Sequence, residues 1–285
     1  MNYYKSRSLL TNPVDSLVIY DRQDIPFSDK KLPELSLVIP TFNESQNIRE
    51  LIDILVKLLD RTIPADYESI VVDDDSPDRT WEIADRLAAR YPQLRVIRRE
   101  TERGLSTGVI RGWQAARGEI LGVIDADLQH PPEILLQLWA EMDKGVELAV
   151  ASRNVAGGGV SEWSIVRRFL SRGAQILGLV ILPEVTGRLS DPMSGCFMVR
   201  RSAIANRWLS PVGYKILIEV VARGQIRWIA EVGYVFRERL IGASKVTWKQ
   251  YLEYIQHLLK LRLSLWSVTR LRPRDRSLAV AERLP

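Results

Sequence analysis

The sequence is poor in cysteine and histidine. Cys196 is the one cysteine among 285 residues, and there are two histidines. One thiol cannot form an intramolecular disulfide, so the chain is not a small disulfide-stabilised scaffold, and the role of a small buried hydrophobe suits Cys196 better. A zinc site is also disfavoured, because such sites are usually built from clustered Cys and His ligands.

Long apolar runs are missing as well. ILGLVIL at residues 176–182 is far shorter than the about 20 apolar residues that a membrane-spanning helix needs. Charged side chains are scattered among the short apolar stretches of the N-terminal region, unlike a signal peptide. We therefore expect neither export nor a transmembrane helix. A role at a membrane would be peripheral, or would depend on an integral-membrane partner.

The composition is otherwise that of a globular protein, 46% hydrophobic and 26% charged. This length suffices for one large α/β domain or two small ones. From Leu35, short β-rich runs alternate with segments of helical periodicity, which is typical of a mostly parallel sheet flanked by helices. The predicted strands are residues 35–40, 69–73, 94–98, 119–125 and 146–153. We predict an N-terminal extension (1–34), a central domain (35–240) and a C-terminal segment (241–285).

Two helix ends carry specific sequence signals. Asn43 and Gln46 are spaced as a capping pair for the helix that contains Ile48. Gly118 follows the helix that begins near Ser106, and glycine is the usual residue in the left-handed conformation at a helix C-terminus. We predict these roles for the three residues.

Polar residues follow four of the predicted strands. In chain order they are Thr41, Asn43 and Glu44; Asp73, Asp74 and Asp75; Asp125, Asp127 and Gln129; and Ser152 and Arg153. Any one of these loops also resembles an ordinary turn or helix cap. In open α/β sheets, however, ligands bind beyond the carboxyl ends of the strands, so four such loops at one edge favour a binding site. A dinucleotide site is disfavoured, because no GxGxxG motif follows the first strand.

The stretch GVIDADLQHPPE, residues 122–133, indicates a metal. In extended backbone, side chains two positions apart point the same way, so Asp125, Asp127 and Gln129 can direct oxygen atoms to one point. Mg²⁺ or Mn²⁺ suits such oxygen ligands, and Mg²⁺ is typically held by one or two carboxylates together with phosphate oxygens and water. The predicted ligand is therefore phosphorylated. Pro131 and Pro132 then start the next helix.

Nine motifs, taken in order, carry a specific resemblance. They are VIPTFNE, VVDDDSPD, RGLSTG, DADLQHPPE, ASR, WSIVRRFLSRGA, DPMSGCFMVRR, GYKILIE and FRERLIGASKV. The chain resembles the family 2 glycosyltransferases with the GT-A fold, and within them the polyprenyl-phosphate hexose synthases, above all the mannose synthases. The resemblance covers roughly residues 35–250. It implies that residues 35–240 form a GT-A catalytic domain.

The resemblance also implies a role for each matching position. Pro40, Phe42, Glu44, Asp73, Asp74 and Asp125 would bind the nucleotide, and Asp125, Asp127 and Gln129 would surround Mg²⁺ or Mn²⁺ on its diphosphate. Asp127, Lys215 and Arg239 would be catalytic, the two cations by reaching phosphates. Arg153, Arg167 and Ser171 would receive the acceptor phosphate, while Ser194 and Gly195 would line the sugar and acceptor pocket. Phe42 stands where tyrosine is frequent in the family, which leaves the base open.

The chemistry that the resemblance implies fits these residue types. A lipid phosphate is largely anionic at neutral pH, so it can attack a sugar without a strong general base. The expected reaction is an inverting displacement that moves mannose from GDP-mannose to a polyprenyl phosphate. UDP-glucose is the alternative donor. Arg167 and Arg168 are equally typical of the solvated side of a helix, and Lys215 of a surface lysine.

Two segments are candidates for contact with a lipid surface. Residues 163–182 combine arginines with a strongly apolar second half, as in a helix lying in the membrane interface, although core packing explains the pattern equally well. Residues 247–266 place seven apolar and aromatic residues on or near one stripe: Trp248, Tyr251, Leu252, Ile255, Leu258, Leu259 and Trp266. From Lys245 to the end there are nine Lys or Arg and three acidic residues. We expect peripheral attachment to the cytoplasmic face of a membrane and no nucleic-acid partner.

Two further functions are compatible with the sequence. A family 2 transferase that builds polysaccharide would need a carboxylate base beside its acceptor, and residues 150–215 offer Glu162, Glu184 and Asp191. A nucleotide-sugar sensor or membrane-bound scaffold without turnover would be expected to have damaged motifs. Asp125, Asp127 and Arg239 are intact, which favours an enzyme.

Overall fold

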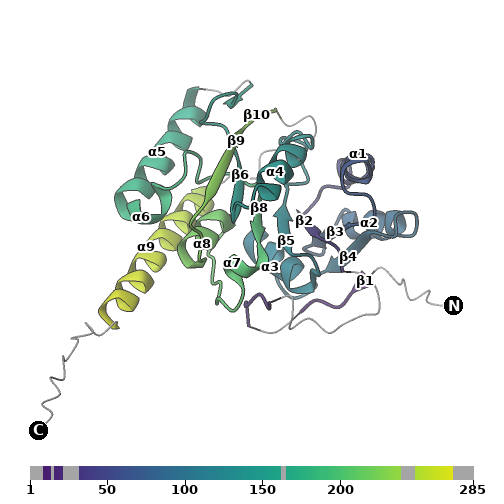
Figure 1. Ribbon diagram of the computed structural model, residues 1–285, viewed down its shortest axis with the longest axis horizontal. Coiled ribbons are helices and arrows are strands. Elements are labelled where there is room, and N and C mark those ends of the chain that lie inside the picture. Colours follow the sequence, from purple (N-terminus) through teal and green to yellow (C-terminus); the bar gives the residue numbers. More distant parts are fainter. Residues whose placement is uncertain (1–8, 14–15, 22–31, 162–164, 239–247, 272–285) are drawn as a thin grey trace, which may run out of the picture.

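The computed structural model describes residues 9–13, 16–21, 32–161, 165–238 and 248–271. Its centre is an eight-stranded sheet with the order β1-β4-β3-β2-β5-β8-β6-β9 (Figure 1). The strands are β1 (Leu9–Leu10), β2 (Leu35–Thr41), β3 (Tyr67–Asp73), β4 (Leu94–Arg98), β5 (Ile120–Val123), β6 (Leu148–Ser152), β8 (Phe197–Arg200) and β9 (Ile229–Gly233). A small second sheet pairs β7 (Gly159–Val160) with β10 (Val235–Phe236). The mostly parallel sheet is as predicted.

One strand runs against the others. β2 pairs in parallel with both β3 and β5, and β6 pairs in parallel with β9. β8 lies between β5 and β6 and is antiparallel to both. Consequently β5 and β6 point the same way as β2 and β3, and β8 begins at the edge where those strands end.

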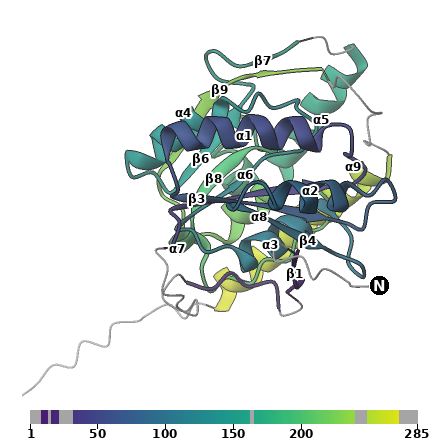
Figure 2. The same cartoon turned by 90° about the vertical axis from the view of Figure 1, so that its right-hand side faces the viewer.

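Helices cover both faces of the sheet (Figure 2). They are α1 (Ile48–Thr62), α2 (Thr80–Ala88), α3 (Leu105–Ala115), α4 (Ile134–Asp143), α5 (Ile165–Ile181), α6 (Pro183–Thr186), α7 (Arg201–Ile204), α8 (Ile216–Arg223) and α9 (Trp248–Leu271). The pleat of β2 sorts its side chains between two hydrophobic clusters. Leu37 and Ile39 pack with α1, α2 and α4, whereas Val38 packs with α3, α8 and α9.

The roles predicted for Asn43, Gln46 and Gly118 at helix ends are wrong. Helix α1 begins at Ile48, after Asn47; Asn43 has a positive φ of 54°, and its N–H donates to Ser76 Oγ at 2.9 Å. Gly118 has no positive φ; a Cβ there would lie 2.6 Å from the backbone N of Ser36. Glycine is therefore needed at this position because the chain passes close to β2.

Part of the predicted N-terminal extension packs against the sheet and helices. β1 adds to the sheet edge beside β4, with Leu9 paired to Val96. Ile19 is fully buried, and its carbonyl accepts from the N–H of Asn206 at 2.7 Å. The Nε2 of Gln114 on α3 donates to the carbonyl of Ser16 at 2.7 Å. These contacts join residues 9–13 and 16–21 to segments much later in the chain.

The C-terminal helix α9 has two differently used faces. Tyr254, His257, Leu258 and Leu261 are buried, and the Tyr254 hydroxyl donates to the Ala174 carbonyl of α5 at 3.0 Å. Leu252 and Leu259 are exposed. The predicted single stripe is therefore wrong, since Leu258 lies in the core and these two leucines do not. No helix in the described part of the chain is both long and apolar enough to cross a membrane.

Gly112→Ala should destabilise the fold, because α3 approaches the sheet closely at this residue. A Cβ there would lie 2.6 Å from Val38 Cγ1. Such overpacking typically costs about 1–3 kcal/mol, measured here as the free energy of unfolding in urea. Gly173→Ala in α5 is the control, because a Cβ there meets nothing within 4 Å. Equal stability of G112A and the parent protein would contradict the close approach.

Candidate active site

The polar loops predicted from the sequence meet at one edge of the sheet. They follow the carboxyl ends of β2, β3, β5 and β6, which share one direction. The segment before β8, including Ser194 and Gly195, reaches the same edge because β8 starts there. Segments around residues 40, 73, 125, 152 and 194 thus form one site.

Asp125 and Asp127 follow β5. The Asp125 side chain is 27% exposed, whereas Asp127 is largely buried. Asp127 Oδ1 accepts from the backbone N–H of Gln129 at 3.1 Å, and Leu128 between them has a positive φ of 58°. The Nε2 of Gln129 donates to the Arg237 carbonyl at 3.1 Å, which leaves Oε1 as the atom suited to a cation. The loop after β5 is therefore held by one hydrogen bond within it and by another to the backbone of Arg237.

This donor set fits a divalent cation bound mainly through its substrate. Within the described ranges there is no group of three or more His, Cys, Asp or Glu residues that could hold a metal alone. Two carboxylates and one amide fit Mg²⁺ or Mn²⁺ when diphosphate oxygens and water complete the shell. Asp125, Asp127 and Gln129 would hold the ion.

Gly195 lies directly against Asp125. A Cβ at Gly195 would be 2.4 Å from Asp125 Oδ2, too close for any side chain without moving the carboxylate. Next to it, the hydroxyl of Ser194 is buried and donates to the Cys196 carbonyl at 3.2 Å. The turn before β8 thus packs on the carboxylate that follows β5.

A buried ion pair lies on the β6 side of the site. Arg153 donates to both carboxylate oxygens of Asp191, from Nε at 2.6 Å and from Nη2 at 2.7 Å. Burial acts to raise the pKa of Asp191, but the hydrogen bonds and charge of Arg153 outweigh it and lower that pKa. Asp191 is therefore an ionised partner of Arg153.

Lys215 is brought to the site from the segment before α8. Its Nζ donates to the Met193 carbonyl at 2.8 Å. Burial, with the positive charge of Arg153, lowers the pKa of Lys215 to about 8, although Asp125 and Asp191 oppose the shift. Lys215 is thus no ordinary surface lysine, and a bound anion would favour its charged form.

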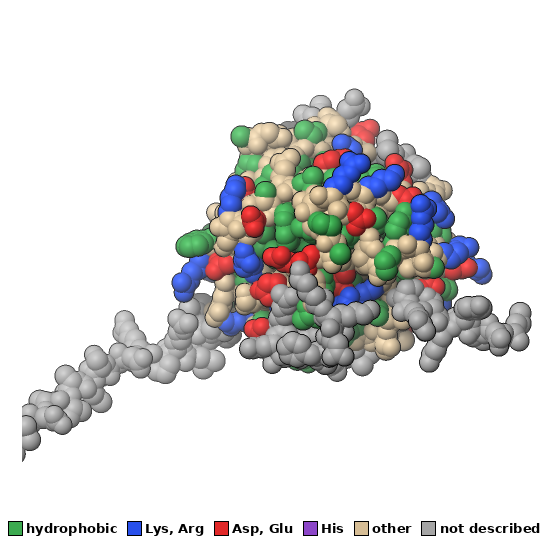
Figure 3. Space-filling model, turned by 45° about the vertical axis from the view of Figure 1, so that its right-hand side comes forward, with side chains coloured by type: hydrophobic (Ala, Val, Ile, Leu, Met, Phe, Trp, Pro, Cys, Tyr) green, Lys and Arg blue, Asp and Glu red, His purple; other side chains and the backbone are tan. Residues whose placement is uncertain are grey.

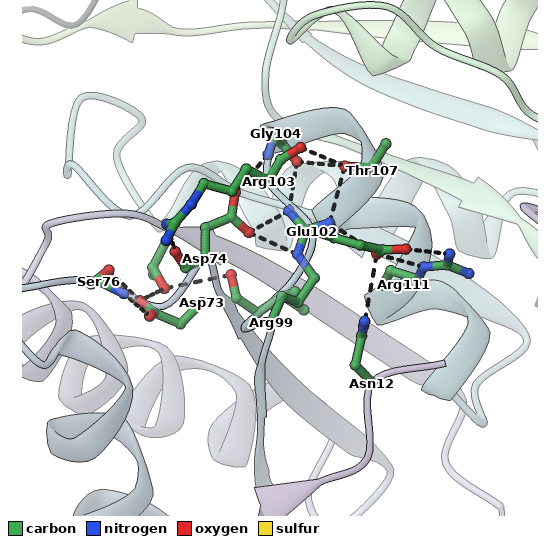
Figure 4. Close-up of polar contacts among 12 residues, drawn as sticks. Asn12, Asp73, Asp74, Ser76, Arg99, Glu102, Arg103, Gly104, Thr107 and Arg111 are labelled. Atoms are coloured by element: carbon green, nitrogen blue, oxygen red, sulfur yellow. Dashed lines mark hydrogen bonds and ion pairs between the residues drawn. The ribbon is translucent and has the colours of Figure 1, made fainter. Parts of the chain in front are cut away.

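Asp73 and Asp74 shape the loop after β3 (Figure 4). Asp73 is fully buried and accepts from the Thr41 hydroxyl at 2.7 Å and from the Ser76 N–H at 2.8 Å. Burial raises its pKa. Asp74 Oδ2 accepts from the Gly104 N–H at 2.7 Å. Both side chains therefore hold neighbouring loops of the predicted nucleotide site in place.

Arg99 is a residue of this site that the sequence reasoning missed. Its side chain is fully buried, and its guanidinium donates to Asp74 Oδ1, from Nε at 2.7 Å. It also donates to the Gly104 carbonyl at 2.8 Å and to the Thr107 hydroxyl at 3.0 Å. Glu102 extends this network to Arg111 and, at 3.5 Å, to Asn12 of the N-terminal segment. The one available signal was an arginine pair, Arg98 and Arg99, at a strand end before RGLSTG.

The other predicted nucleotide-site residues lie after β2. Pro40 is buried within β2, and Phe42 is exposed, with the Arg103 guanidinium 5.6 Å from its ring centroid. The buried carboxylate of Glu44 accepts from Asn47 Nδ2 at 2.8 Å.

Three predicted residues are described incompletely or not at all. Arg239 lies outside the described residues. Arg167 and Ser171 belong to α5, and the structure describes the backbone of these two residues but not their side chains. Their predicted contacts with phosphates stay predictions.

Arg99→Met should strongly destabilise the protein, because it leaves Asp74 buried without its cation. Removing one member of a buried ion pair costs about 3–5 kcal/mol, and adding Asp74→Asn should recover part of that loss. Urea unfolding of the two single variants and the double variant measures the coupling. Lys144→Met, which breaks an exposed pair with Glu141, is the control and should cost about 1 kcal/mol or less. Additive effects of R99M and D74N would contradict the pairing.

Comparison with known proteins finds that this sequence is similar to those of sugar transferases. The family model described as "Glycosyl transferase family 2" matches residues 36–208. A dolichol-phosphate mannosyltransferase from Pyrococcus furiosus is 42% identical over 228 residues, 80% of this chain and 63% of that protein. A protein of the same name from Saccharomyces cerevisiae is 33% identical over 194 residues, 67% of this chain and 70% of the yeast protein. The chain therefore spans less than two thirds of the Pyrococcus relative.

Solved structures share the fold at lower sequence identity. Glucosyl-3-phosphoglycerate synthase from Mycobacterium tuberculosis, crystallised with Mn²⁺ and UDP-glucose, has a TM-score of 0.60 and 23% identity, covering 81% of this chain and 78% of the other. Another crystal structure of that enzyme has a TM-score of 0.57 and 24% identity, with 81% and 80% covered. This likeness confirms the predicted GT-A type of sheet.

Proposed function

Because this chain belongs to glycosyl transferase family 2, we propose that it transfers a hexose, in the first place mannose from GDP-mannose, to a polyprenyl phosphate. The names of its Pyrococcus and yeast relatives support mannose and a dolichol-phosphate acceptor. UDP-glucose is the second donor, and a fold neighbour has been crystallised with it. The choice between the donors depends on contacts to the base and the sugar, in which Phe42 is one contributor.

One observation carries the choice of a phosphate acceptor: the described acceptor side has cations and no unengaged carboxylate. Asp191 is bound through both oxygens to Arg153. Glu184 lies on the surface and pairs with Arg262. Glu162, the third candidate base, lies outside the described residues. A sugar hydroxyl needs a base to remove its proton, whereas a lipid phosphate is already ionised. Arg153 and Lys215 therefore favour a phosphate.

The reaction that follows is a single displacement at the anomeric carbon. An acceptor phosphate oxygen forms the new bond while the bond to the nucleoside diphosphate breaks, so the configuration inverts. A divalent cation held by Asp125, Asp127 and Gln129 would neutralise charge on the diphosphate. Lys215 and Arg239 would stabilise the same leaving group, and Arg153, Arg167 and Ser171 would hold the acceptor phosphate.

The lipid acceptor requires contact with a membrane surface, and α5 and α9 supply a candidate. Among the side chains that the structure describes on them, the exposed large apolar ones are Ile176, Leu179 and Val180 on α5, and Leu252, Leu259 and Leu263 on α9. The two helices contact each other and lie at one end of the molecule (Figure 1). Arg172, Lys260 and Arg262 are exposed on the same helices. Apolar side chains flanked by cations are typical of a surface that binds anionic lipid.

The face turned forward in Figure 3 differs from this arrangement. Acidic and basic side chains are interspersed there, with acidic groups near the middle (Figure 3). Nucleic-acid-binding surfaces are usually continuous basic patches. The visible part of this face therefore does not form a continuous basic patch of that kind (Figure 3).

Transfer assays test the proposal directly. Radiolabelled GDP-mannose and UDP-glucose are each supplied with polyprenyl phosphate and Mg²⁺ or Mn²⁺, and the labelled lipid is extracted. Mannosyl lipid is expected, and Asp127→Asn should lower the rate about a hundredfold or more, equivalent to about 3 kcal/mol of transition-state stabilisation. Asp143→Asn, at an exposed position ending α4, is the control. Transfer to a free sugar hydroxyl alone would reject the lipid acceptor.

Loss of the Lys215 proton should lower kcat/KM at alkaline pH. If its ammonium stabilises the leaving diphosphate, kcat/KM falls as the pH rises through about 8, where the free enzyme loses that proton. Lys215→Arg keeps its charge, so its decline should move to higher pH. Profiles of kcat/KM between pH 6 and 10 measure the shift; the same decline in both proteins would assign it to another group.

A further inference from the structure

His130 is a buried polar residue that the proposed reaction does not use. It is 2% exposed, and neither ring nitrogen has a hydrogen-bond partner. The nearby Tyr234 hydroxyl is likewise buried without a partner. An unpaired buried polar atom typically costs about 1–3 kcal/mol, so a histidine kept in this state calls for an explanation.

Aromatic packing fixes the orientation of the His130 ring. Tyr234 stacks on it, with centroids 5.2 Å apart and planes 24° apart. Phe236 of β10 meets it edge-on, at 5.3 Å and 88°. With the ring held in this way, Nδ1 lies 3.8 Å from Asp125 Oδ2. His130 therefore lies beside the carboxylate whose other neighbour is Gly195.

We propose that His130 is a positioning residue for the cation site, whose Nδ1–H donates a hydrogen bond to Asp125 Oδ2 when that carboxylate binds the metal. The inference rests on the proposed metal-dependent function. The present 3.8 Å is longer than a hydrogen bond. Such contacts are often long in ligand-free enzymes and shorten in the complex.

Two features suit His130 to this task. Partners that hydrogen-bond a metal ligand orient it, and losing one commonly weakens metal binding about 10–100-fold. In addition, a neutral imidazole can donate one N–H without placing a positive charge beside the cation.

A purely structural role makes a different prediction. If His130 only fills space between Tyr234 and Phe236, phenylalanine would replace it well, because the ring contacts remain and the unpaired nitrogens disappear. Stability would stay equal or rise, and metal binding would not change. A positioning role predicts the same stability together with weaker metal binding.

The test measures Mn²⁺ affinity and thermal stability of the full chain at a fixed concentration of GDP, whose diphosphate oxygens complete the metal shell without allowing transfer, against a protein-free blank. The EPR signal of free Mn²⁺ gives the dissociation constant, and calorimetry gives Tm. His130→Phe should weaken Mn²⁺ binding about tenfold without lowering Tm. His130→Asn should restore part of the affinity, because its amide nitrogen is bonded to Cγ, as Nδ1 is.

Tyr234→Phe is the matched control. It removes the other unpaired buried polar atom beside the ring and leaves the proposed donor, so Mn²⁺ affinity should not change. Equal Mn²⁺ affinity of H130F and the parent protein would overturn the role of His130 without affecting the proposed function. Similar losses of Mn²⁺ affinity in H130F and Y234F would do the same. So would an H130N variant that binds Mn²⁺ no better than H130F. If the parent protein itself binds no Mn²⁺, the proposed metal site fails, and the role of His130 fails with it.

Discussion

The antiparallel placement of β8 between β5 and β6 is the constraint on which the candidate site depends. A strand that runs against its neighbours starts where they end, so the turn containing Gly195 is delivered to the carboxylates after β5. The contact is so close that a Cβ at Gly195 would lie 2.4 Å from Asp125 Oδ2. Residues about 70 positions apart in the chain thus form one wall of the site, through sheet pairing that no local signal supplies.

Buried charge pairs keep the loops around this wall in place. Arg153, after β6, pairs with Asp191 in the segment before β8, and Arg99, after β4, pairs with Asp74 after β3. Because a buried charge without a partner is strongly unfavourable, each pair resists displacement of either loop. At the first of these pairs the charges also affect titration: burial, with the positive charge of Arg153, lowers the pKa of Lys215, and the hydrogen bonds and charge of Arg153 outweigh burial to lower the pKa of Asp191. Structure and chemistry are therefore coupled at the same few side chains.

The region around His130 differs from these charge pairs, in which each buried group has a partner. There, polar atoms are buried without partners in the described structure, between aromatic rings. Natural proteins tolerate such local conflicts mainly at functional sites, where stability is sacrificed for geometry. The position of His130 next to Asp125 agrees with this pattern. Within a single loop, the side chains of Asp127 and Gln129 are engaged in hydrogen bonds, whereas the His130 ring nitrogens are not.

The sequence by itself determined the element order from β2 to β6 and the chemical inventory of the site. Apolar runs such as residues 35–40 and the helical spacing from Ile48 to Leu59 mark strands and helices, because burial of one face repeats with the period of the backbone. Asp125, Asp127 and Gln129 were identifiable because their spacing and residue types suit a hard cation. The family motifs supplied the rest of the predicted roles.

Only the tertiary structure decided which of these residues meet and what each contact requires. Gly118 looked like a helix terminator and instead allows the chain to pass β2, and the arginine pair at 98–99 did not indicate that Arg99 is buried against Asp74. On α9, Leu258 and Leu259 are adjacent in the sequence, but one is in the core and the other on the surface. The physical reason is the same in each case: sheet order, close approach and ion pairing join residues distant in the chain, and local periodicity carries no information about such partners.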